Sequence, residues 1–449
     1  MSWILLWAHC CAACAQSAEQ VSRPQVHLVS RIDTRDFGAE TLRIGDLNAD
    51  GAPELLFIQS VFGTRAINCL TATSIAGEVL WQTGGAAAGN GRIYSDLPVQ
   101  VYDWDADGWN EVLYVRQANY AEPPYAGGVR ERADRYEGTA TLVVLDGRSG
   151  KEKGTLKLPA PADDCFLLAD LTGRGRREDL VVKDRYWNMW GVTHAGQELW
   201  HWAGSTGHFP AIADLDADGK DEVFVGFALL DNDGKVLFAK EPHGAHQDAC
   251  YLLRPTDGRW RLLFGNGGIH CLGGDGTELW QHALGEAQHV VAARFRQDSE
   301  VQLAVVDRTP VPNHRRDRNA WGILYLYDLE GREIWRRQQE TGAWAIGTLS
   351  VNWRGEGHCR DLLVYGQGAG RPAVIYDGNG QITDTFPMAF APQVNDQDRA
   401  GDVYALAADV WGDAREEVIL SHSHGACIYA NARPAEVPTL YNETLYPGM

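Results

Sequence analysis

An acidic loop between Asp214 and Glu222 has the residue types and the spacing of a cation site. Oxygen-bearing side chains occupy its first, third, fifth and ninth positions, namely Asp214, Asp216, Asp218 and Glu222, and Gly219 occupies the sixth. This spacing suits a hard cation, because alternate residues of a tight turn point inward and glycine permits the left-handed bend. Apolar runs flank the loop on both sides, so we expect it to join two β-strands. The loop therefore predicts a calcium site on a β-hairpin.

The same loop recurs along the chain. Intact copies begin at Asp46 and Asp103, and copies that have lost acidic positions begin at Asp170 and Asp409. The two further intact copies place their predicted metal ligands at Asp46, Asn48, Asp50 and Glu54, and at Asp103, Asp105, Asp107 and Glu111. Self-similarity of this kind indicates a repeat architecture in which each hairpin belongs to one structural unit. We predict Ca²⁺ as the cofactor of the intact loops.

Each repeat follows a plan that predicts a blade of four β-strands. An apolar strand enters the acidic loop, a Val/Leu/Ile strand leaves it, and a third strand leads to a Gly-x-x-Leu/Ile-Trp tail, as in GEVLW ending at Trp81. Four-stranded repeats along one chain are typical of a β-propeller. We predict an all-β, eight-bladed β-propeller, with a seven-bladed ring as the alternative, closed by an N-terminal strand at 25–32. The aromatic residue of each tail is expected to pack between blades.

Length, charge and cysteine content narrow the class of protein. The chain of 449 residues exceeds the size of one ordinary core, which favours repeats. Its 60 acidic and 40 basic residues give a net charge of −20, which argues against binding to nucleic acid or to an anionic membrane surface. The cysteines after residue 15 lack metal-ligand spacing, so we expect most of them to be buried thiols.

The two ends of the chain are expected to lie outside the repeats. Residues 1–15 hold a short apolar run and an Ala-Cys-Ala site, which predicts a signal peptide and a secreted or periplasmic protein. This run is too short to span a membrane. We assign 16–433 to a single propeller domain and expect 434–449, a Pro-rich and aromatic tail, to pack on it. No membrane span and a monomer are expected.

Many Arg, His and Tyr residues are expected on the propeller face opposite the acidic loops. Loops that join second to third strands, or one blade to the next, lie on that face. They carry the candidate substrate-binding residues Arg92, Tyr94, Arg116, Lys183, Asp248 and Arg308, and the candidate catalytic residues His208, Tyr186, Arg185, His246 and His289. Arginine binds carboxylates through paired hydrogen bonds and aromatic rings stack on sugars, so this composition suits an acidic polysaccharide or oligosaccharide.

Four of these residues are expected to converge at the central channel, because they stand at or just before the first strands of three adjacent blades. They are His208, His246, Asp248 and His289. Converging His and Asp side chains can hold a metal or act as acid and base near neutral pH.

Further motifs accompany the acidic repeats: KDRYW at Lys183, the GHFP stretch around His208, VNW at Val351 and the terminal YNETLYPGM. Together they resemble secreted β-propeller polysaccharide lyases with calcium-binding FG-GAP/VCBS-type repeats, above all rhamnogalacturonan lyases and L-rhamnose-α-1,4-D-glucuronate lyases. The resemblance implies a carbon–oxygen lyase that cleaves a uronate-containing, rhamnose-containing polysaccharide by β-elimination. The alternatives are a non-catalytic carbohydrate-binding propeller of the FG-GAP type and a related glycoside hydrolase.

β-Elimination assigns roles to the candidate residues. The C5 proton of a uronate can be removed once positive charge neutralises the adjacent carboxylate, and a second group protonates the departing C4 oxygen. The expected roles are carboxylate binding by Arg185 with Arg92 or Arg308, proton abstraction by His208 or Tyr186, and acid catalysis or metal binding by His246 and His289.

Overall fold

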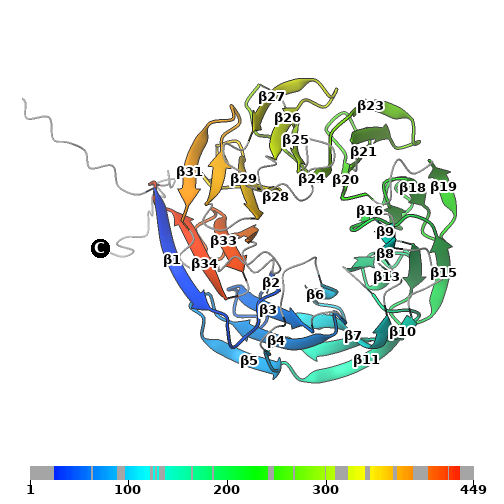
Figure 1. Ribbon diagram of the computed structural model, residues 1–449. Helices are drawn as coiled ribbons and strands as arrows, with labels where there is room; N and C mark the ends of the chain where they lie inside the picture. Colours follow the sequence, from blue (N-terminus) through cyan, green and yellow to red (C-terminus); the bar gives the residue numbers. More distant parts are fainter. Residues whose placement is uncertain are drawn as a thin grey trace, which may run out of the picture.

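The regular structure of the protein is built from β-strands arranged in a ring (Figure 1). The computed structural model describes residues 25–61, 64–87, 90, 97–121, 125–126, 129–130, 137–162, 165–184, 187–240, 247–265, 268–298, 300–308, 322–338, 344–367, 372–387, 403–422 and 424–434. Within these ranges, no helix has the length and apolar character needed to cross a membrane. The strands form eight four-stranded sheets, so the predicted eight-bladed β-propeller is confirmed.

The blades are numbered along the chain, each from its inner strand outward. Blades 1 to 4 consist of β2 (Thr41–Gly45), β3 (Glu54–Ser60), β4 (Ile67–Thr73) and β5 (Val79–Gly84); β6 (Val99–Tyr102), β7 (Glu111–Ala121), β10 (Glu137–Asp146) and β11 (Glu152–Leu158); β12 (Phe166–Ala169), β13 (Asp179–Lys183), β14 (Asn188–Val192) and β15 (Glu198–Ala203); and β16 (Ala211–Ala213), β17 (Glu222–Phe224), β18 (Ala228–Leu230) and β19 (Val236–Ala239). A two-stranded hairpin, β8 (Tyr125–Ala126) with β9 (Val129–Arg130), is inserted in blade 2.

The second half of the ring follows the same plan. Blades 5 to 8 consist of β20 (Ala249–Leu253), β21 (Arg261–Gly265), β22 (Ile269–Gly273) and β23 (Glu278–His282); β24 (Ala287–Ala293), β25 (Gln302–Asp307), β26 (Ile323–Tyr327) and β27 (Glu333–Gln338); β28 (Trp344–Val351), β29 (Asp361–Gln367), β30 (Ala373–Tyr376) and β31 (Ile382–Phe386); and β32 (Tyr404–Ala408), β33 (Glu417–His422), β34 (Gly425–Asn431) and β1 (Val26–Asp33).

The N-terminal strand closes the ring as predicted. β1 pairs antiparallel with β34, from Val26 opposite Asn431 to Asp33 opposite Gly425. Blade 8 therefore takes its outermost strand from the other end of the chain (Figure 1). This pairing covers an edge of β34 that could otherwise pair with another chain.

The tail tryptophans join neighbouring blades, as the sequence predicts. Each indole Nε1 donates a hydrogen bond to a backbone carbonyl in the turn between the third and fourth strands of the next blade. The pairs are Trp81 with Gly147, Trp200 with Asn232, Trp280 with Leu329 and Trp335 with Gly378, at 2.6–2.9 Å. A large apolar ring whose polar N–H is satisfied suits a buried seam. The repeated tail therefore sets how the blades pack against one another.

The cysteine prediction is also confirmed for the residues that the structure describes. Cys69, Cys165, Cys271 and Cys427 are buried free thiols, and Cys250 and Cys359 are partly buried free thiols. Burial raises the pKa of the Cys271 thiol to about 12, so this group stays protonated at neutral pH.

Candidate functional site

Three predicted site residues, His208, Asp248 and His289, lie on neighbouring blades. His208 precedes β16, Asp248 precedes β20, and His289 lies in β24. These strands are the inner strands of blades 4, 5 and 6, and they stand next to one another around the ring (Figure 1). Nε2 of His208 lies 3.7 Å from Oδ1 of Asp248, and the charge of Asp248 also acts on His289. We call these residues the inner-strand cluster.

Backbone contacts fix His208 beside Asp248. The N–H of His208 donates to the carbonyl of Gln247 at 3.1 Å, and the Gln247 side-chain amide donates to the carbonyl of Thr206 at 3.2 Å. Gly207 has a φ of +58°, and a Cβ there would lie 2.1 Å from the amide carbon of Gln247. Only glycine fits this approach, so the GHFP stretch positions the imidazole.

His289 is held as a neutral imidazole. Its ring packs against Gly347, where a Cβ would lie 2.5 Å from Nδ1, and against the edge of Tyr365. Burial lowers the pKa of His289 to about 4; the charge of Arg308 acts in the same direction, and a backbone hydrogen bond with Thr348 and the charge of Asp248 oppose it. At neutral pH this side chain is therefore an uncharged imidazole. It carries no extra proton, so it cannot act as an imidazolium acid that donates one.

Arg308 is oriented by a buried carboxylate. Its Nε lies 3.2 Å from Oε2 of Glu286, and a second guanidinium nitrogen contacts the other carboxylate oxygen. Glu286 is itself 2% exposed, and its N–H donates to Oδ1 of Asp307 at 2.8 Å. The pair leaves Arg308 preorganised near His289, but part of its positive charge is already balanced within the protein.

The KDRYW turn is built around a buried acid. Asp184 accepts hydrogen bonds from the backbone N–H groups of Trp187 and Asn188, at 2.8 and 2.9 Å, and from the Asn188 side chain at 2.6 Å. Burial raises the pKa of Asp184, and these hydrogen bonds oppose the rise. Lys183 is 1% exposed, so its predicted role in substrate binding remains a prediction without an accessible side chain to support it.

The remaining predicted site residues are separate from the inner-strand cluster or lie outside the described residues. Arg116 lies on β7 and contacts Glu152 on β11, the outermost strand of blade 2, at 3.3 Å. The structure does not bring Arg116 to the inner-strand cluster. The predicted residues outside the described part of the chain are Arg92, Tyr94, Arg185, Tyr186 and His246.

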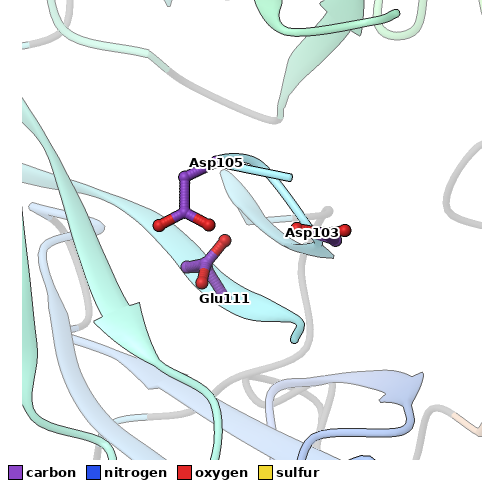
Figure 2. Close-up of side chains that lie close together, drawn as sticks. All are labelled: Asp103, Asp105 and Glu111. Atoms are coloured by element: carbon purple, nitrogen blue, oxygen red, sulfur yellow. The ribbon is translucent and has the colours of Figure 1, made fainter. Parts of the chain in front are cut away.

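The three intact acidic loops share one backbone turn. Their fourth residues, Ala49, Ala106 and Ala217, all have positive φ, between 56° and 65°. In each loop the ninth-position glutamate is buried and accepts a hydrogen bond from the N–H of the second residue, at 2.5–2.8 Å. Figure 2 shows the Asp103 loop, where the carboxylates of Asp105 and Glu111 face each other. The ninth-position carboxylate thus clips the hairpin, and its second oxygen faces the interior of the loop.

The Asp214 loop has the donor set of a hard-cation site. Carboxylate oxygens of Asp214, Asp216 and Asp218 lie within 4.8 Å of one another. Glu222 is 1% exposed, and its Oε1 is a buried oxygen with no hydrogen-bond partner among the described residues. Burial raises the pKa of Glu222 to about 7, and the negative charges of Asp216 and Asp214 add to the rise. These residues fit a calcium ion, because Ca²⁺ takes several oxygen ligands and would neutralise the buried acid.

The other two intact loops differ in what meets the second oxygen of the glutamate. In the Asp46 loop, the amide nitrogen of Asn48 donates to Oε1 of Glu54 at 2.8 Å. In the Asp103 loop, Oε1 of Glu111 meets the ammonium group of Lys153.

Sequence reasoning missed three residues that contact the candidate sites, namely Lys153, Gln247 and Glu286. For Lys153 a signal was present, since GKEKG in blade 2 departs from the Gly-x-x-Leu/Ile-Trp tail.

Comparisons with known proteins agree with this architecture. The sequence model of the C-terminal domain of rhamnogalacturonan lyase family 11 matches residues 181–447. Two Bacillus subtilis (strain 168) proteins are similar along most of the chain. Rhamnogalacturonan endolyase YesW is 25% identical over 91% of this chain and 70% of its own length, and rhamnogalacturonan exolyase YesX is 23% identical over 85% and 69%.

Solved structures show the same fold. The exotype rhamnogalacturonan lyase YesX superposes with a TM-score of 0.63 at 20% identity, covering 89% of this chain and 73% of that chain. The V. cholerae biofilm matrix protein Bap1 superposes with a TM-score of 0.59 at 14% identity, covering 92% of both chains. At such identities the structural likeness establishes the propeller fold alone.

Proposed function

This chain belongs to rhamnogalacturonan lyase family 11, a family of carbon–oxygen lyases that act on polysaccharides, and we propose that it cleaves a uronate-containing, rhamnose-containing polysaccharide by β-elimination. The family match over residues 181–447 carries the proposal. This segment contains His208, Asp248, His289 and Arg308, whose arrangement supports a site for an acidic sugar.

The inner-strand cluster supplies the groups that β-elimination requires. Arg308, together with Arg185, binds the uronate carboxylate and so makes the C5 proton removable. His208, oriented by Asp248, accepts that proton as the C4–O bond breaks, and a double bond forms between C4 and C5. Tyr186 or His246 returns a proton to the departing oxygen, and Arg92 and Tyr94 are the further candidates for substrate binding.

Calcium bound in the acidic loops would stabilise the propeller. We assign the acidic loops to the calcium-binding FG-GAP/VCBS type, with the Asp214 loop as the best-supported site. Asp214, Asp216, Asp218 and Glu222 would hold the ion, and the bound ion would supply positive charge that closes the hairpin. The Asp46 loop is a second candidate site, through Asp46, Asn48, Asp50 and Glu54.

The proposed polysaccharide substrate and the signal-peptide-like residues 1–15 both favour a location outside the cytoplasm. A polysaccharide cannot cross a membrane unaided, and residues 1–15 resemble a signal peptide. We assign the protein to the periplasm or the extracellular space, where as a monomer it would meet its acidic polymer.

Product chemistry tests the proposed function. Rhamnogalacturonan, ulvan and gum arabic are incubated with the protein, and ultraviolet absorbance of the C4=C5 product is followed with the release of reducing ends. A lyase yields both signals, a hydrolase yields reducing ends alone, and a binding protein yields neither. The wild type should produce the unsaturated product on a rhamnose-containing polymer, and His208→Ala should not. Reducing ends without the chromophore would refute the proposal.

A further inference from the structure

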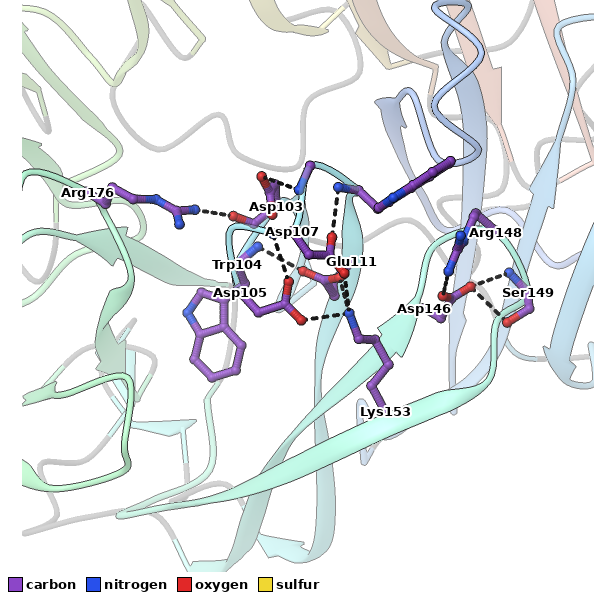
Figure 3. Close-up of polar contacts among 12 residues, drawn as sticks. Asp103, Trp104, Asp105, Asp107, Glu111, Asp146, Arg148, Ser149, Lys153 and Arg176 are labelled. Atoms are coloured by element: carbon purple, nitrogen blue, oxygen red, sulfur yellow. Dashed lines mark hydrogen bonds and ion pairs between the residues drawn. The ribbon is translucent and has the colours of Figure 1, made fainter.

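An ammonium group lies inside the acidic loop of blade 2. Nζ of Lys153 is 2.7 Å from Oδ2 of Asp105, 2.7 Å from Oε1 of Glu111 and 3.4 Å from Oδ2 of Asp107. The Glu111 side chain is 1% exposed, whereas that of Lys153 is 29% exposed. Figure 3 shows the lysine extending from β11 to the two carboxylates. A single cation therefore contacts three of the four predicted metal ligands of this loop.

A β-bulge in the outermost strand directs Lys153 toward the loop. In blade 2, Val144 pairs with Gly154 and Leu145 pairs with Glu152, which makes Lys153 the extra residue of the bulge. A bulge redirects the side chain of the strand that carries it. The fold therefore sets the backbone position from which the Lys153 side chain reaches the loop.

The same bulge occurs in six other blades, where an aliphatic or neutral residue occupies it. Blade 4 is the closest match, since Leu229 pairs with Phe238 and Leu230 pairs with Val236, leaving Leu237 as the extra residue. The extra residues of blades 1, 3, 5, 6 and 7 are Leu80, Leu199, Leu279, Ile334 and Thr383. Among these seven bulges only blade 2 places a charged residue next to its acidic loop.

The buried carboxylates explain why a lysine at the bulge, in place of a leucine, matters for the acidic loop. A buried acid is costly unless a positive charge or a donor meets it. Lys153 meets Glu111 in blade 2, and in blade 7 Arg354 forms hydrogen bonds of 2.8 and 2.7 Å with the equivalent acid, Asp361. In blade 4, where the bulge residue is Leu237, Oε1 of Glu222 has no such partner among the described residues. Blades 2 and 4 thus have the same type of acidic loop, but among the described residues only blade 2 supplies a side-chain cation to the buried glutamate.

We propose that Lys153 is a built-in cation that takes the place of calcium in the Asp103 loop, so that blade 2 closes its hairpin without a metal ion. The ammonium uses the oxygens of Asp105 and Glu111 that a calcium ion would need, so both cannot be bound at once. Blade 2 is thereby independent of the calcium concentration, and the metal requirement of the ring is confined to loops that lack a lysine or arginine.

Calcium counting tests the proposal with the purified full chain. Lys153→Leu introduces the residue found at the matching position of blade 4, Lys153→Arg keeps the charge, and Lys157→Leu is a matched control on the exposed side of the same strand. Bound calcium per chain is measured by equilibrium dialysis and elemental analysis, with melting curves in calcium and in chelator. Lys153→Leu should bind one more calcium ion per chain than the wild type, and its melting temperature should respond more strongly to chelation. Lys153→Arg and Lys157→Leu should match the wild type.

The reciprocal change keeps the test decisive if Lys153→Leu folds poorly. Leu237→Lys should place an ammonium beside Glu222 and lower bound calcium by one ion per chain; this arm rests on the proposed calcium of the Asp214 loop. A folded Lys153→Leu protein that binds no additional calcium would overturn the proposal. Loss of a bound ion on Asp105→Asn in the wild-type background would also overturn it. Asp216→Asn reports separately on the Asp214 loop, so failure of the proposed calcium site and failure of the lysine assignment are distinguishable.

Discussion

Nε2 of His208 lies 3.7 Å from Oδ1 of Asp248, across the boundary between blades 4 and 5. The two side chains differ in access to solvent, since that of Asp248 is 2% exposed and that of His208 is 16% exposed. A buried carboxylate thus stands behind an imidazole that solvent can reach, an arrangement that orients a base toward a bound ligand. The contact exists only because the ring brings the two blades together.

Replacing the acid should therefore impair turnover without removing the imidazole. We expect Asp248→Asn to lower kcat with little change in KM, and His208→Ala to lower it by about 10²–10⁴-fold, the usual contribution of a general base. Initial rates of unsaturated product over a range of substrate concentrations measure both constants. A changed pH profile in Asp248→Asn would identify an effect on His208, whereas an unchanged profile with a lowered melting temperature would indicate a purely structural role.

The pH dependence should reveal the neutral state of His289. Its pKa is lowered from 6.5 to about 4, mainly by burial, so the ring stays uncharged above about pH 4 in the folded protein. If elimination needs this neutral ring, the part of the pH profile that belongs to His289 should be a loss of activity below about pH 4, separate from any loss caused by protonation of the base His208. The pH profile of kcat in His289→Gln, compared with the wild type, measures this limb. A limb that remains in His289→Gln would have to come from another group.

The free energy of unfolding should also decrease as the pH falls, because of His289. Between pH 6.5 and about 4 the unfolded chain binds a proton at His289 that the folded chain excludes. The free energy of unfolding therefore decreases as the pH falls through this window, and it is unaffected by this residue above it. Melting temperatures of wild type and His289→Gln across the window should converge as the pH falls.

Sequence reasoning was sufficient for features that repeat at fixed spacing. The Asp214 to Glu222 loop and the tail ending at Trp81 are local signals, and each recurrence adds evidence for the same blade. Ring closure by 25–32 also followed, because blade 8 lacked a strand. Such features depend on the chain order of residues, which the sequence states directly.

Features that depend on side-chain direction could not be read in the same way. Arg116 was expected at a substrate, but it lies on a strand from which its side chain reaches Glu152 at the outer edge. Arg308 is predicted to bind a carboxylate, and its orienting ion pair with Glu286, 22 residues away, depends on side-chain directions that the sequence does not state. Lys153 enters the loop of Asp105 through a bulge, and a bulge changes the strand parity on which such assignments rest.

Removing one inter-blade tryptophan contact should lower stability and spare the chemistry. Trp81 is 8% exposed, and its Nε1 donates to Gly147 in the next blade at 2.6 Å. Trp81→Phe keeps most of the apolar area but leaves the carbonyl without this donor, which should cost about 0.5–1.5 kcal/mol of the free energy of unfolding. Trp411→Phe is the control, because Trp411 is 52% exposed. Chemical denaturation measures both, and an equal loss in the two variants would argue against the inter-blade role.

Substitutions on the two faces of the propeller should have different effects on the melting temperature and on its response to chelator. Asp216→Asn removes a carboxylate from the Asp214 loop, so it should lower the melting temperature in calcium and make the protein less sensitive to chelator. A calcium ion bound only by the folded state contributes roughly 1–4 kcal/mol when present at about 10 to 1,000 times its Kd. Arg185→Ala and His208→Ala should instead leave the melting curve unchanged in calcium and in chelator.

Activity per folded molecule then identifies the catalytic face. Asp216→Asn should keep near wild-type turnover in its folded fraction, because its loop joins the first and second strands at the end of the blade away from the GHFP segment. Arg185→Ala and His208→Ala should lose turnover while folding normally, because each removes a group that meets the uronate and little that holds a blade. Rates of unsaturated product, normalised to the folded fraction at the assay temperature, give the comparison. Full activity in His208→Ala together with lost activity in Asp216→Asn would place the catalytic site on the acidic-loop face, where calcium would then take part in binding the substrate.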